Sequence, residues 1–574
     1  MTHRIVLKDA YKGYTLDLDK FIPPQETVRR FKDKLKGIRL DILEDTVRID
    51  NGRLDIPVFF SLCGRDAEAV IGAKKQMGKG GTPAQAEASA IMELAERFSL
   101  FSFQQNPRNF LVEKYAQVKD RALSLDMISR SVHDRSEDLQ EACEVFSEIP
   151  LHWTPAYNLT RRQELLVPFD WFFAINEFNG SSAGNCLEEA ALQGLCEVVE
   201  RHVSSIISQN RLKTPAINLI SATDPLALEL IRKYKRAGIR LYVTDFSMDT
   251  GIPTVGVLAY DPTTFPEKSE IVWTAGTTPH PQKSLIRALT EVAQLAGDFN
   301  TNSDYVASGL PKLKDLKEAH FVTHPDGEVN LGDLPDLSHG NIRVEVENAI
   351  DALSRIGMEV IVVDVTHPVL GIPAVYVLIP GAHFRERAAN TSMAMFSAKL
   401  ISQSKDPIRA VGALNRMDDR LPGRYFIKFF LGQVYLSLQE PSQALGYLET
   451  ALDLDPHPQD IPSIYSYMGL CLKELERYDE AIYKLKQAEE FDRERTDIYN
   501  LMGFCFFKLR EHEKAISCFQ RVLELNPGSA IDYANIASNY RDMGDKEKAI
   551  EYYRFALEMD PGIDFARENL HKLQ

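Results

Sequence analysis

Apolar positions in residues 1–405 follow two different spacings, and each spacing predicts a different kind of element. Short β-branched runs bounded by Gly, Pro or Asp, such as RLYVTDFS, PTVGVLAYD, EVIVVDVT and AVYVLIPG, indicate strands. Two pairs of runs, 240–246 with 254–260 and 359–366 with 374–379, are typical of hairpins. Apolar residues three and four positions apart indicate helices at about residues 24–37, 84–103, 186–208, 224–237, 281–297 and 343–356. We therefore expect an α+β region with mixed sheets.

The region 424–574 has a different, repetitive pattern of small residues. The spacings between the first small residues of successive repeats are 37, 34 and 34 residues. Each of these residues is followed 12 positions later by an alanine, which gives the pairs Gly432 and Ala444, Gly469 and Ala481, Gly503 and Ala515, and Ala537 and Ala549. In three of the four repeats a proline follows after 12 more positions, where it would end a helix. A 34-residue period of this kind predicts an all-α solenoid of about four tetratricopeptide repeats (TPRs).

The sequence thus predicts an α+β domain at residues 1–405, a linker at 406–423 and a TPR domain at 424–574. A stack of such repeats usually presents a concave groove to a peptide or protein. We therefore expect the repeats to bind a partner protein or a substrate.

Composition narrows the possible partners and compartment. The net charge of -16 and the isoelectric point of about 5.4 give no general attraction to nucleic acid or to an anionic membrane. The absence of an apolar segment at the start argues against a secretory signal, and no run of 18 apolar residues predicts a membrane span. The seven cysteines are scattered without a CxxC pair, which fits a reducing cytoplasm and neither a disulfide framework nor a zinc site.

The same acidic helix face occurs twice, 104 residues apart. The first copy consists of Ser89, Glu93, Glu96 and Arg97, and the second of Gln193, Glu197, Glu200 and Arg201. Residues three and four apart are neighbours on a helix, so each copy places two carboxylates beside an arginine. Taken alone, either segment also fits an ordinary solvated helix. The repetition favours another interpretation, in which bound cations neutralise the acids.

Further polar residues accompany these helices. A glycine turn with Lys79 precedes the first helix, and a loop of small residues precedes the second, where Asn185 is a candidate N-cap and Glu189 shares the acidic face. A third predicted helix carries Arg287, Glu291 and Gln294 at positions i, i+4 and i+7. Mg²⁺ prefers carboxylate and phosphate oxygens, and arginine matches phosphate geometry. Without a Walker A or kinase motif, the pattern indicates a Mg²⁺–nucleotide site built on carboxylates.

These motifs resemble the YcaO family over residues 1–400. The resemblance is carried by SxxxExxER from Ser89, by NGxSAGNxxxEA over 179–190, by ExxER from Glu197 and by RAxxExxQ from Arg287. The motifs occur in the family's order, and PQET at 24–27 and Lys8 also fit the family's pattern. A YcaO domain followed by TPRs is an arrangement of members that do not form azolines.

The resemblance implies roles for individual residues, with ATP and Mg²⁺ as cofactors. It assigns the metal ions to Glu93, Glu96, Glu189, Glu197 and Glu200. It assigns the nucleotide to Lys8, Thr27, Ser89, Arg97, Asn185, Gln193, Arg201 and Arg287, with Arg201 and Arg287 at the phosphates. Lys79, Glu291 and Gln294 remain candidates without an assigned role, and the catalytic residues are unknown. The resemblance also implies a homodimer.

By the same resemblance, we expect an enzyme that activates a backbone amide by phosphorylating its oxygen. YcaO enzymes of the azoline branch end in a proline-rich tail, whereas this chain ends in RENLHKLQ after its repeats. The sequence therefore favours thioamidation or a related protein modification over azoline formation. Two alternatives stay open: an ATP-binding accessory factor for ribosomal protein β-methylthiolation, and a TPR scaffold without catalysis.

Overall fold

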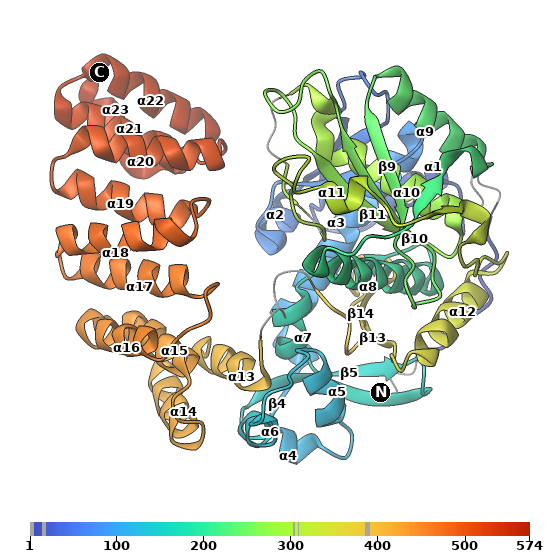
Figure 1. Cartoon of the computed structure of the whole chain (residues 1–574), viewed down its shortest axis with the longest axis horizontal. Helices are drawn as coiled ribbons and strands as arrows, with labels where there is room; N and C mark the ends of the chain where they lie inside the picture. Colours follow the sequence, from blue (N-terminus) through green and yellow to red (C-terminus); the bar gives the residue numbers. More distant parts are fainter. Residues whose placement is uncertain (1–4, 14–18, 302–304, 308, 385–390) are drawn as a thin grey trace. The chain divides into compact units, whose positions relative to one another are not determined.

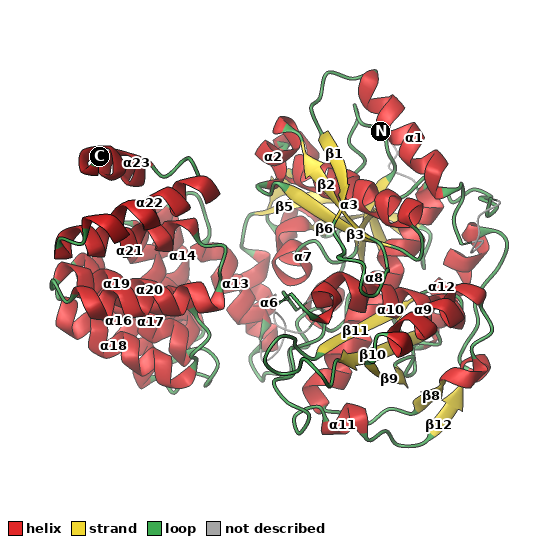
Figure 2. Cartoon of the chain, turned by 90° about the horizontal axis from the view of Figure 1, so that it is seen from above, coloured by secondary structure: helices red, strands yellow, loops and turns green. Residues whose placement is uncertain are grey.

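The computed structural model describes residues 5–13, 19–301, 305–307, 309–384 and 391–574. One compact unit comprises Met1–Ser136 and Ser147–Met393, and the other comprises Glu137–Phe146 and Ala394–Gln574. Among the described residues, all strands belong to the first unit, and the second consists of helices and their connections (Figure 2). The predicted fold class, a mixed-sheet α+β region followed by helical repeats, is therefore confirmed.

The described strands of the first unit form three sheets. One sheet has the strand order β1 (Leu43–Arg48), β2 (Val58–Cys63) and β3 (Lys75–Lys79). Another has the order β11 (Val272–Thr277), β10 (Thr254–Tyr260), β9 (Arg240–Asp245), β8 (Ala216–Asn218) and β12 (Glu328–Asn330). The last has the order β4 (Leu111–Glu113), β5 (Leu151–Asn158), β13 (Ile361–Asp364), β14 (Ala374–Leu378) and β7 (Ser181–Ala183), with β6 (Gln163–Pro168) paired to β5.

Both predicted hairpins are present. Strands β9 and β10 pair antiparallel with Asp245 opposite Val255, and β13 and β14 pair antiparallel with Ile361 opposite Leu378. The pairing of β8 with β12 is parallel, so the second sheet is mixed. Strand β14 is buried along its whole length, which explains its uninterrupted apolar run.

Three long helices pack against strands of the three sheets. Helix α3 (Pro83–Gln105) packs on β2, β3 and β7, and α8 (Leu187–Asn210) packs on β7, β14 and β11. Helix α10 (Pro281–Ala296) covers β10 and β11 (Figure 1). The other helices of this unit are α1 (Pro24–Lys36), α2 (Arg65–Ile71), α4 (Tyr115–Val118), α5 (Leu125–Arg130), α7 (Phe169–Asn176), α9 (Pro225–Arg236), α11 (His320–Thr323) and α12 (Ile342–Arg355).

The first residues of these helices are fixed by side-chain caps. Thr82 and Gln85 form a capping box at the start of α3, followed by a proline at the first helical position. The sequence favours Asn185 as the N-cap of α8, but this prediction is wrong. Cys186 is the N-cap, and its Sγ accepts a hydrogen bond from the backbone N–H of Glu189 at 3.4 Å. The side chain of Asn185 is thereby free to bond with Glu189 and Thr27 instead.

Three histidines from separate segments meet beside α8. The rings of His133 and His383 stack with centroids 3.6 Å apart, and the backbone N–H of His383 donates to Nδ1 of His202 at 3.0 Å. Burial, followed by the neighbouring His133, lowers the pKa of His202 to about 4. The accepting role of Nδ1 agrees with a neutral ring, so His202 stays uncharged in the fold at neutral pH.

Acid should therefore destabilise this unit through protonation of His202. Since the folded pKa lies below that of the unfolded chain, stability is complete above pH 6.5 and is lost as the pH falls towards about 4. At pH 5 we expect the free energy of unfolding to be about 2 kcal/mol lower than at pH 7 because of His202. Urea unfolding at pH 7 and pH 5 measures this loss, and His202→Gln should reduce it while the exposed His324→Gln should not. An equal loss in all three proteins would contradict the prediction.

The second unit contains four helix pairs followed by a closing helix. The pairs are α15 (Tyr425–Ser437) and α16 (Pro441–Asp453), α17 (Ile461–Glu474) and α18 (Tyr478–Phe491), α19 (Thr496–Lys508) and α20 (His512–Leu525), and α21 (Ala530–Met543) and α22 (Lys546–Met559), before α23 (Asp564–Leu573). A Cβ on Gly432, Gly469 or Gly503 would come within 2.6–2.8 Å of a side chain of the second helix. Glycine therefore permits the close crossing that the repeat spacing predicts.

The boundary between the units differs from the sequence prediction. Pro407–Arg420, which lies in the expected linker 406–423, forms helix α14. Together with most of α13 (Met393–Ser402), it belongs to the same unit as the repeats. The sequence boundary at residue 405 therefore lies inside this helical unit.

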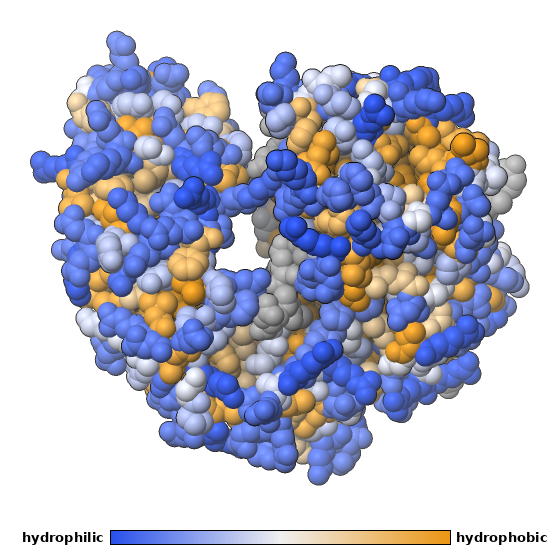
Figure 3. All heavy atoms as spheres, viewed as in Figure 1, coloured by the Kyte–Doolittle hydropathy of each residue, from blue (hydrophilic) through white to orange (hydrophobic). Residues whose placement is uncertain are grey.

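A short segment from the first half of the chain completes the second unit. Arg420 of α14 forms ion pairs with Glu141 at 2.5 Å and with Glu144 at 2.7 Å, both on α6 (Leu139–Ser147). Arg424 pairs with Asp138 at 2.7 Å. On the face of the repeats seen in Figure 3, hydrophobic residues lie in small patches among hydrophilic ones. In the described part of the chain, no helix combines the length and apolar character needed to cross a membrane.

Candidate functional site

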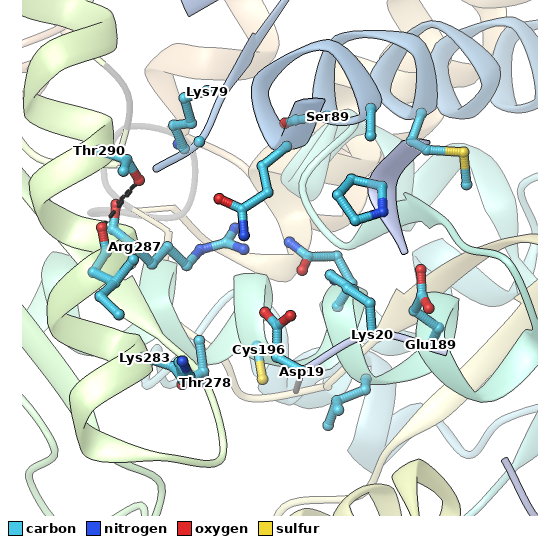
Figure 4. A pocket seen from close by; sticks show the side chains of 18 of the residues that line it. Asp19, Lys20, Lys79, Ser89, Glu189, Cys196, Thr278, Lys283, Arg287 and Thr290 are labelled. Atoms are coloured by element: carbon cyan, nitrogen blue, oxygen red, sulfur yellow. Dashed lines mark hydrogen bonds between the residues drawn. The ribbon is translucent and has the colours of Figure 1, made fainter. Parts of the chain in front are cut away.

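A cavity of about 330 Å³ lies where the N-terminal segment, β3, α3, α8 and α10 meet. Its lining includes these residues singled out from the sequence: Thr27, Lys79, Ser89, Glu93, Glu96, Asn185, Glu189, Gln193, Arg287 and Gln294. Lys79, Arg287 and Lys283 lie along one side, Glu189 lies on the other, and Asp19 and Lys20 lie between them (Figure 4). Residues more than 200 positions apart are thus gathered around one space.

Helix α3 contributes the first acidic group. Arg97 forms ion pairs with Glu93 at 3.0 Å and Glu96 at 2.9 Å, and Ser181 Oγ donates to Glu96 at 2.5 Å. Burial, followed by the carboxylates of Glu93 and Glu197, raises the pKa of Glu96 although Arg97 opposes the shift. The carboxylates of α3 and α8 are therefore close enough to repel one another, and a cation between them would relieve that repulsion.

Helix α8 contributes the second acidic group. Glu197 accepts from the backbone N–H of Gly180 at 3.1 Å and from Arg201 at 3.3 Å. The buried Glu200 accepts from the backbone N–H of Thr277 at 3.1 Å and lies 3.3 Å from Arg201. Glu197, Glu200 and Arg201 support the cavity from behind its lining. The two copies of the acidic motif thus carry the same arrangement of paired glutamates around an arginine.

Glu189 also belongs to α8, and it lies across the cavity from Lys79 and Arg287. Backbone and amide donors hold its carboxylate there. Its carboxylate accepts from the backbone N–H of Phe21 at 3.0 Å and from Asn185 Nδ2 at 2.9 Å. Thr27 Oγ1 donates to Asn185 Oδ1 at 3.1 Å, which orients the amide. Thr27, Asn185 and Glu189 therefore form one hydrogen-bonded chain along the lining.

The side of the cavity that faces Glu189 is cationic. Lys79, at the end of β3, forms an ion pair with Glu291 of α10, and Arg287 Nε lies 3.4 Å from Glu200. Arg287 Nε is buried and makes no hydrogen bond to any of the described residues. Lys79 and Arg287 both line the cavity, so this wall presents positive charge to an incoming anion.

Lysines missed in the sequence also line the cavity. Lys12 pairs with Glu345 at 2.6 Å, Lys283 pairs with Asp224 at 2.8 Å, and Lys20 lies in the lining. Lys283 stands four residues before Arg287, so the helical period could have identified it. Lys12 and Lys20 belong to an irregular segment in which no period connects them with the helices.

The structure does not bring every predicted residue to the lining. Lys8 is exposed, and its backbone N–H donates to Glu188 at 2.5 Å. Its side chain is therefore separate from the cavity, because this part of the chain runs outside before Lys12 enters the lining. Arg97 and Glu291 lie behind the surface and act on it through their ion-pair partners Glu93, Glu96 and Lys79.

The residues fit a magnesium nucleotide by charge and size. The cavity volume lies within the range of about 300–1,000 Å³ typical of small-molecule sites. Oxygen ligands on α3 and α8 match Mg²⁺, and the guanidinium of Arg287 in the lining matches a phosphate. Among the described residues, no group of three or more His, Cys, Asp or Glu side chains is placed to hold a metal ion.

Comparison with known proteins also separates a first domain from C-terminal repeats. A family model described as YcaO cyclodehydratase, ATP- and Mg²⁺-binding, matches residues 77–383. Tetratricopeptide models match residues 430–497, 496–529 and 533–563. The first match contains the site helices α3, α8 and α10, and the others overlap each of the helices α15 to α22.

Several proteins are similar to this chain. A protein of Methanothermobacter thermautotrophicus, named only as uncharacterized, is 30% identical over 381 residues, which cover 63% of this chain and 94% of the relative. The Escherichia coli protein named ribosomal protein S12 methylthiotransferase accessory factor YcaO is 24% identical over 396 residues, covering 62% of this chain and 64% of the relative.

A solved structure described as a heterocyclase in complex with substrate and cofactor shares the fold. The TM-score is 0.56 at 22% identity, and the similarity covers 67% of this chain. The chain spans 55% of the length of that heterocyclase.

Proposed function

Because the chain belongs to the YcaO family, whose domain binds ATP and Mg²⁺, we propose that it uses ATP to activate a backbone amide of a peptide or protein. The observation that carries this proposal is the pairing of two walls across one cavity. Acidic groups from α3 and α8 face the cations Lys79 and Arg287 of β3 and α10. Such a division suits a triphosphate whose metal ions bind one wall and whose phosphate oxygens bind the other.

We assign residues to the two parts of the nucleotide complex. Glu93, Glu96, Glu189, Glu197 and Glu200 hold the metal ions, as the resemblance implies. Arg287 holds phosphate oxygens, and the lining residues Thr27, Ser89, Asn185 and Gln193 contact the nucleotide. Arg201, which the resemblance also assigns to the phosphates, lies behind the lining and acts through Glu197 and Glu200. Lys20 replaces Lys8 in this assignment because it lies in the lining, whereas the side chain of Lys8 is exposed.

The chemistry requires a poor leaving group to become a good one. When bound, Mg²⁺–ATP supplies the phosphoryl group that converts an amide oxygen into a phosphate leaving group. Arg97 and Arg201 keep the carboxylates of α3 and α8 oriented, while Arg287 stabilises charge on the transferred group. The buried position of these groups strengthens their electrostatic effect by limiting water.

The repeats are proposed to deliver the substrate or a partner protein. Solenoid repeats commonly hold extended peptides, and this array carries partly exposed aromatic residues such as Phe504. Lys473 and Lys508 lie 5.0 and 5.4 Å from the Phe504 ring, which creates an aromatic and cationic surface on α17 and α19. Thioamidation or a related modification of a protein fits a catalytic unit that carries its own recruiting unit.

A second candidate function is an ATP-binding accessory factor for another modifying enzyme. The name of the E. coli relative, an accessory factor for ribosomal protein S12 methylthiotransferase, favours this alternative. A scaffold without catalysis is a third candidate, but it does not explain why the paired glutamates and arginines are all present.

Removal of magnesium tests the proposed nucleotide site. We expect the full chain to release phosphate from ATP in Mg²⁺ and to lose at least about 90% of this activity when EDTA removes the metal, because the carboxylates of α3 and α8 then repel the triphosphate. Calcium-loaded EDTA that cannot take up Mg²⁺ serves as the control. Magnesium-dependent binding without turnover would favour the accessory factor. Absence of both binding and turnover would favour the scaffold.

A further inference from the structure

Lys79 occupies a rigid position at the edge of the cavity. It is the last residue of β3, and a Cβ on the preceding Gly78 would lie 2.0 Å from the backbone nitrogen of Ala90 in α3. The end of the strand is therefore pressed against the helix that carries Glu93 and Glu96. This contact fixes the Cα of Lys79 relative to the acidic wall.

The ammonium of Lys79 lies among charges from three helices. Burial, followed by the positive charge of Arg287, lowers the pKa of Lys79 to about 7. Glu200 and Glu93 oppose this shift, which indicates that their carboxylates also act on the ammonium. Two cations thus share a buried space beside the residues proposed to bind the metal ions, and an anion between the two cations would stabilise both.

Glu291 holds this lysine in place. It forms the ion pair with Lys79 from α10, four residues after Arg287 and thus on the same helix face. Because one carboxylate serves as the anchor, Lys79 cannot swing into solvent without losing a partly buried ion pair. The pair therefore holds a cation at the lining.

We propose that Lys79 binds the terminal phosphate of the nucleotide and that Glu291 positions its ammonium for this contact. The inference rests on the proposed ATP site and adds a phosphate-binding residue to it. The terminal phosphate is favoured over the base because Lys79 lines the same cavity as the proposed metal ligands Glu93 and Glu96, and a bound Mg²⁺ ion would lie beside the outer phosphates. Lysine serves as a point charge for such a group.

Binding of a nucleotide series tests the proposal. Dissociation constants for ATP, ADP and AMP are measured in Mg²⁺ by calorimetry on the full chain and on Lys79→Met. In Lys79→Met, the loss of one charge-assisted hydrogen bond should raise the dissociation constant for ATP by about 10- to 100-fold. The dissociation constant for AMP should stay within about twofold of the wild-type value. Unchanged AMP binding also reports that the cavity is still folded.

Lys312→Met is the matched control, because Lys312 pairs with Glu270 at 2.9 Å outside the cavity lining. It should leave all three affinities within about twofold. Equal weakening of ATP, ADP and AMP in Lys79→Met, or no weakening, would overturn the inference while the ATP site itself stands. Failure of the wild type to bind any nucleotide would instead refute the site. Lys79→Gln gives the same comparison if the methionine variant does not fold.

Discussion

Glu197→Ala should lower magnesium-dependent ATP turnover by about 100-fold or more. The carboxylate accepts from Gly180 and Arg201, and its charge raises the pKa of Glu96 on α3. It is therefore close to both acidic groups, where a metal ion would be shared. Its removal deletes a proposed ligand and leaves Arg201 with one acidic partner, Glu200, so the metal site is weakened and misaligned.

The measurement is phosphate release at increasing Mg²⁺ concentration, with ATP in excess. Glu87→Ala is the control, because Glu87 lies on α3, pairs with Lys32 at 2.8 Å and is absent from the lining of the cavity. We expect the control to retain turnover within about twofold. Turnover in Glu197→Ala equal to that of the wild type would show that this carboxylate does not hold the metal.

The same pair of variants can identify the substrate. Mass spectrometry of proteins from cells that contain the wild type or Glu197→Ala should reveal a peptide whose modification depends on the carboxylate. An oxygen replaced by sulfur identifies thioamidation, and loss of water identifies ring formation. A modification that persists in Glu197→Ala would point to another enzyme and so favour the accessory factor.

Gly78→Ala should destabilise the unit that contains the cavity and abolish nucleotide binding. A Cβ at this position would lie 2.0 Å from Ala90 N, 2.5 Å from Ala86 O and 2.5 Å from Ala90 Cα. All three are backbone atoms of α3, so β3 must move away from the helix. We expect a loss of about 1–3 kcal/mol in the free energy of unfolding, the usual cost of overpacking. Displacement of β3 also removes Lys79 from the lining.

Urea unfolding and ATP binding measure the two parts of this prediction. Gly332→Ala is the control, because a Cβ on Gly332 meets no atom within 4 Å and its backbone is not in the left-handed region. This control should change stability by less than about 0.5 kcal/mol. Wild-type stability and ATP affinity in Gly78→Ala would mean that β3 and α3 can separate without consequence.

Periodicity was sufficient to predict the elements that carry most of the site. Helices α3, α8 and α10 have long regular patterns, and Glu93, Glu197 and Arg287 follow from their spacing. The repeats were also predictable, because Gly432, Gly469 and Gly503 meet the same steric demand at a fixed interval. Local rules of this kind need no knowledge of distant contacts.

Other features depend on contacts between distant segments. Lys12 and Lys20 enter the lining from an irregular segment. The partner of Lys12 is Glu345, which lies 333 positions later in the sequence. The exposure of Lys8 likewise follows from the path of this segment and from no local motif. The N-cap Cys186 was missed because a thiol is a weaker acceptor than the amide of Asn185, which bonds with Glu189 instead.

The place of α6 in the second unit affects how the chain is synthesised. Residues 137–146 leave the ribosome long before α14, whose Arg420 pairs with Glu141 and Glu144. Domains usually fold in order as they emerge. Here a segment of the second unit, with the buried residues Val145 and Phe146, is synthesised before the first unit is complete and before the rest of its own unit. A truncated protein that starts at α14 would lack this segment, and Arg420 would lose its acidic partners Glu141 and Glu144.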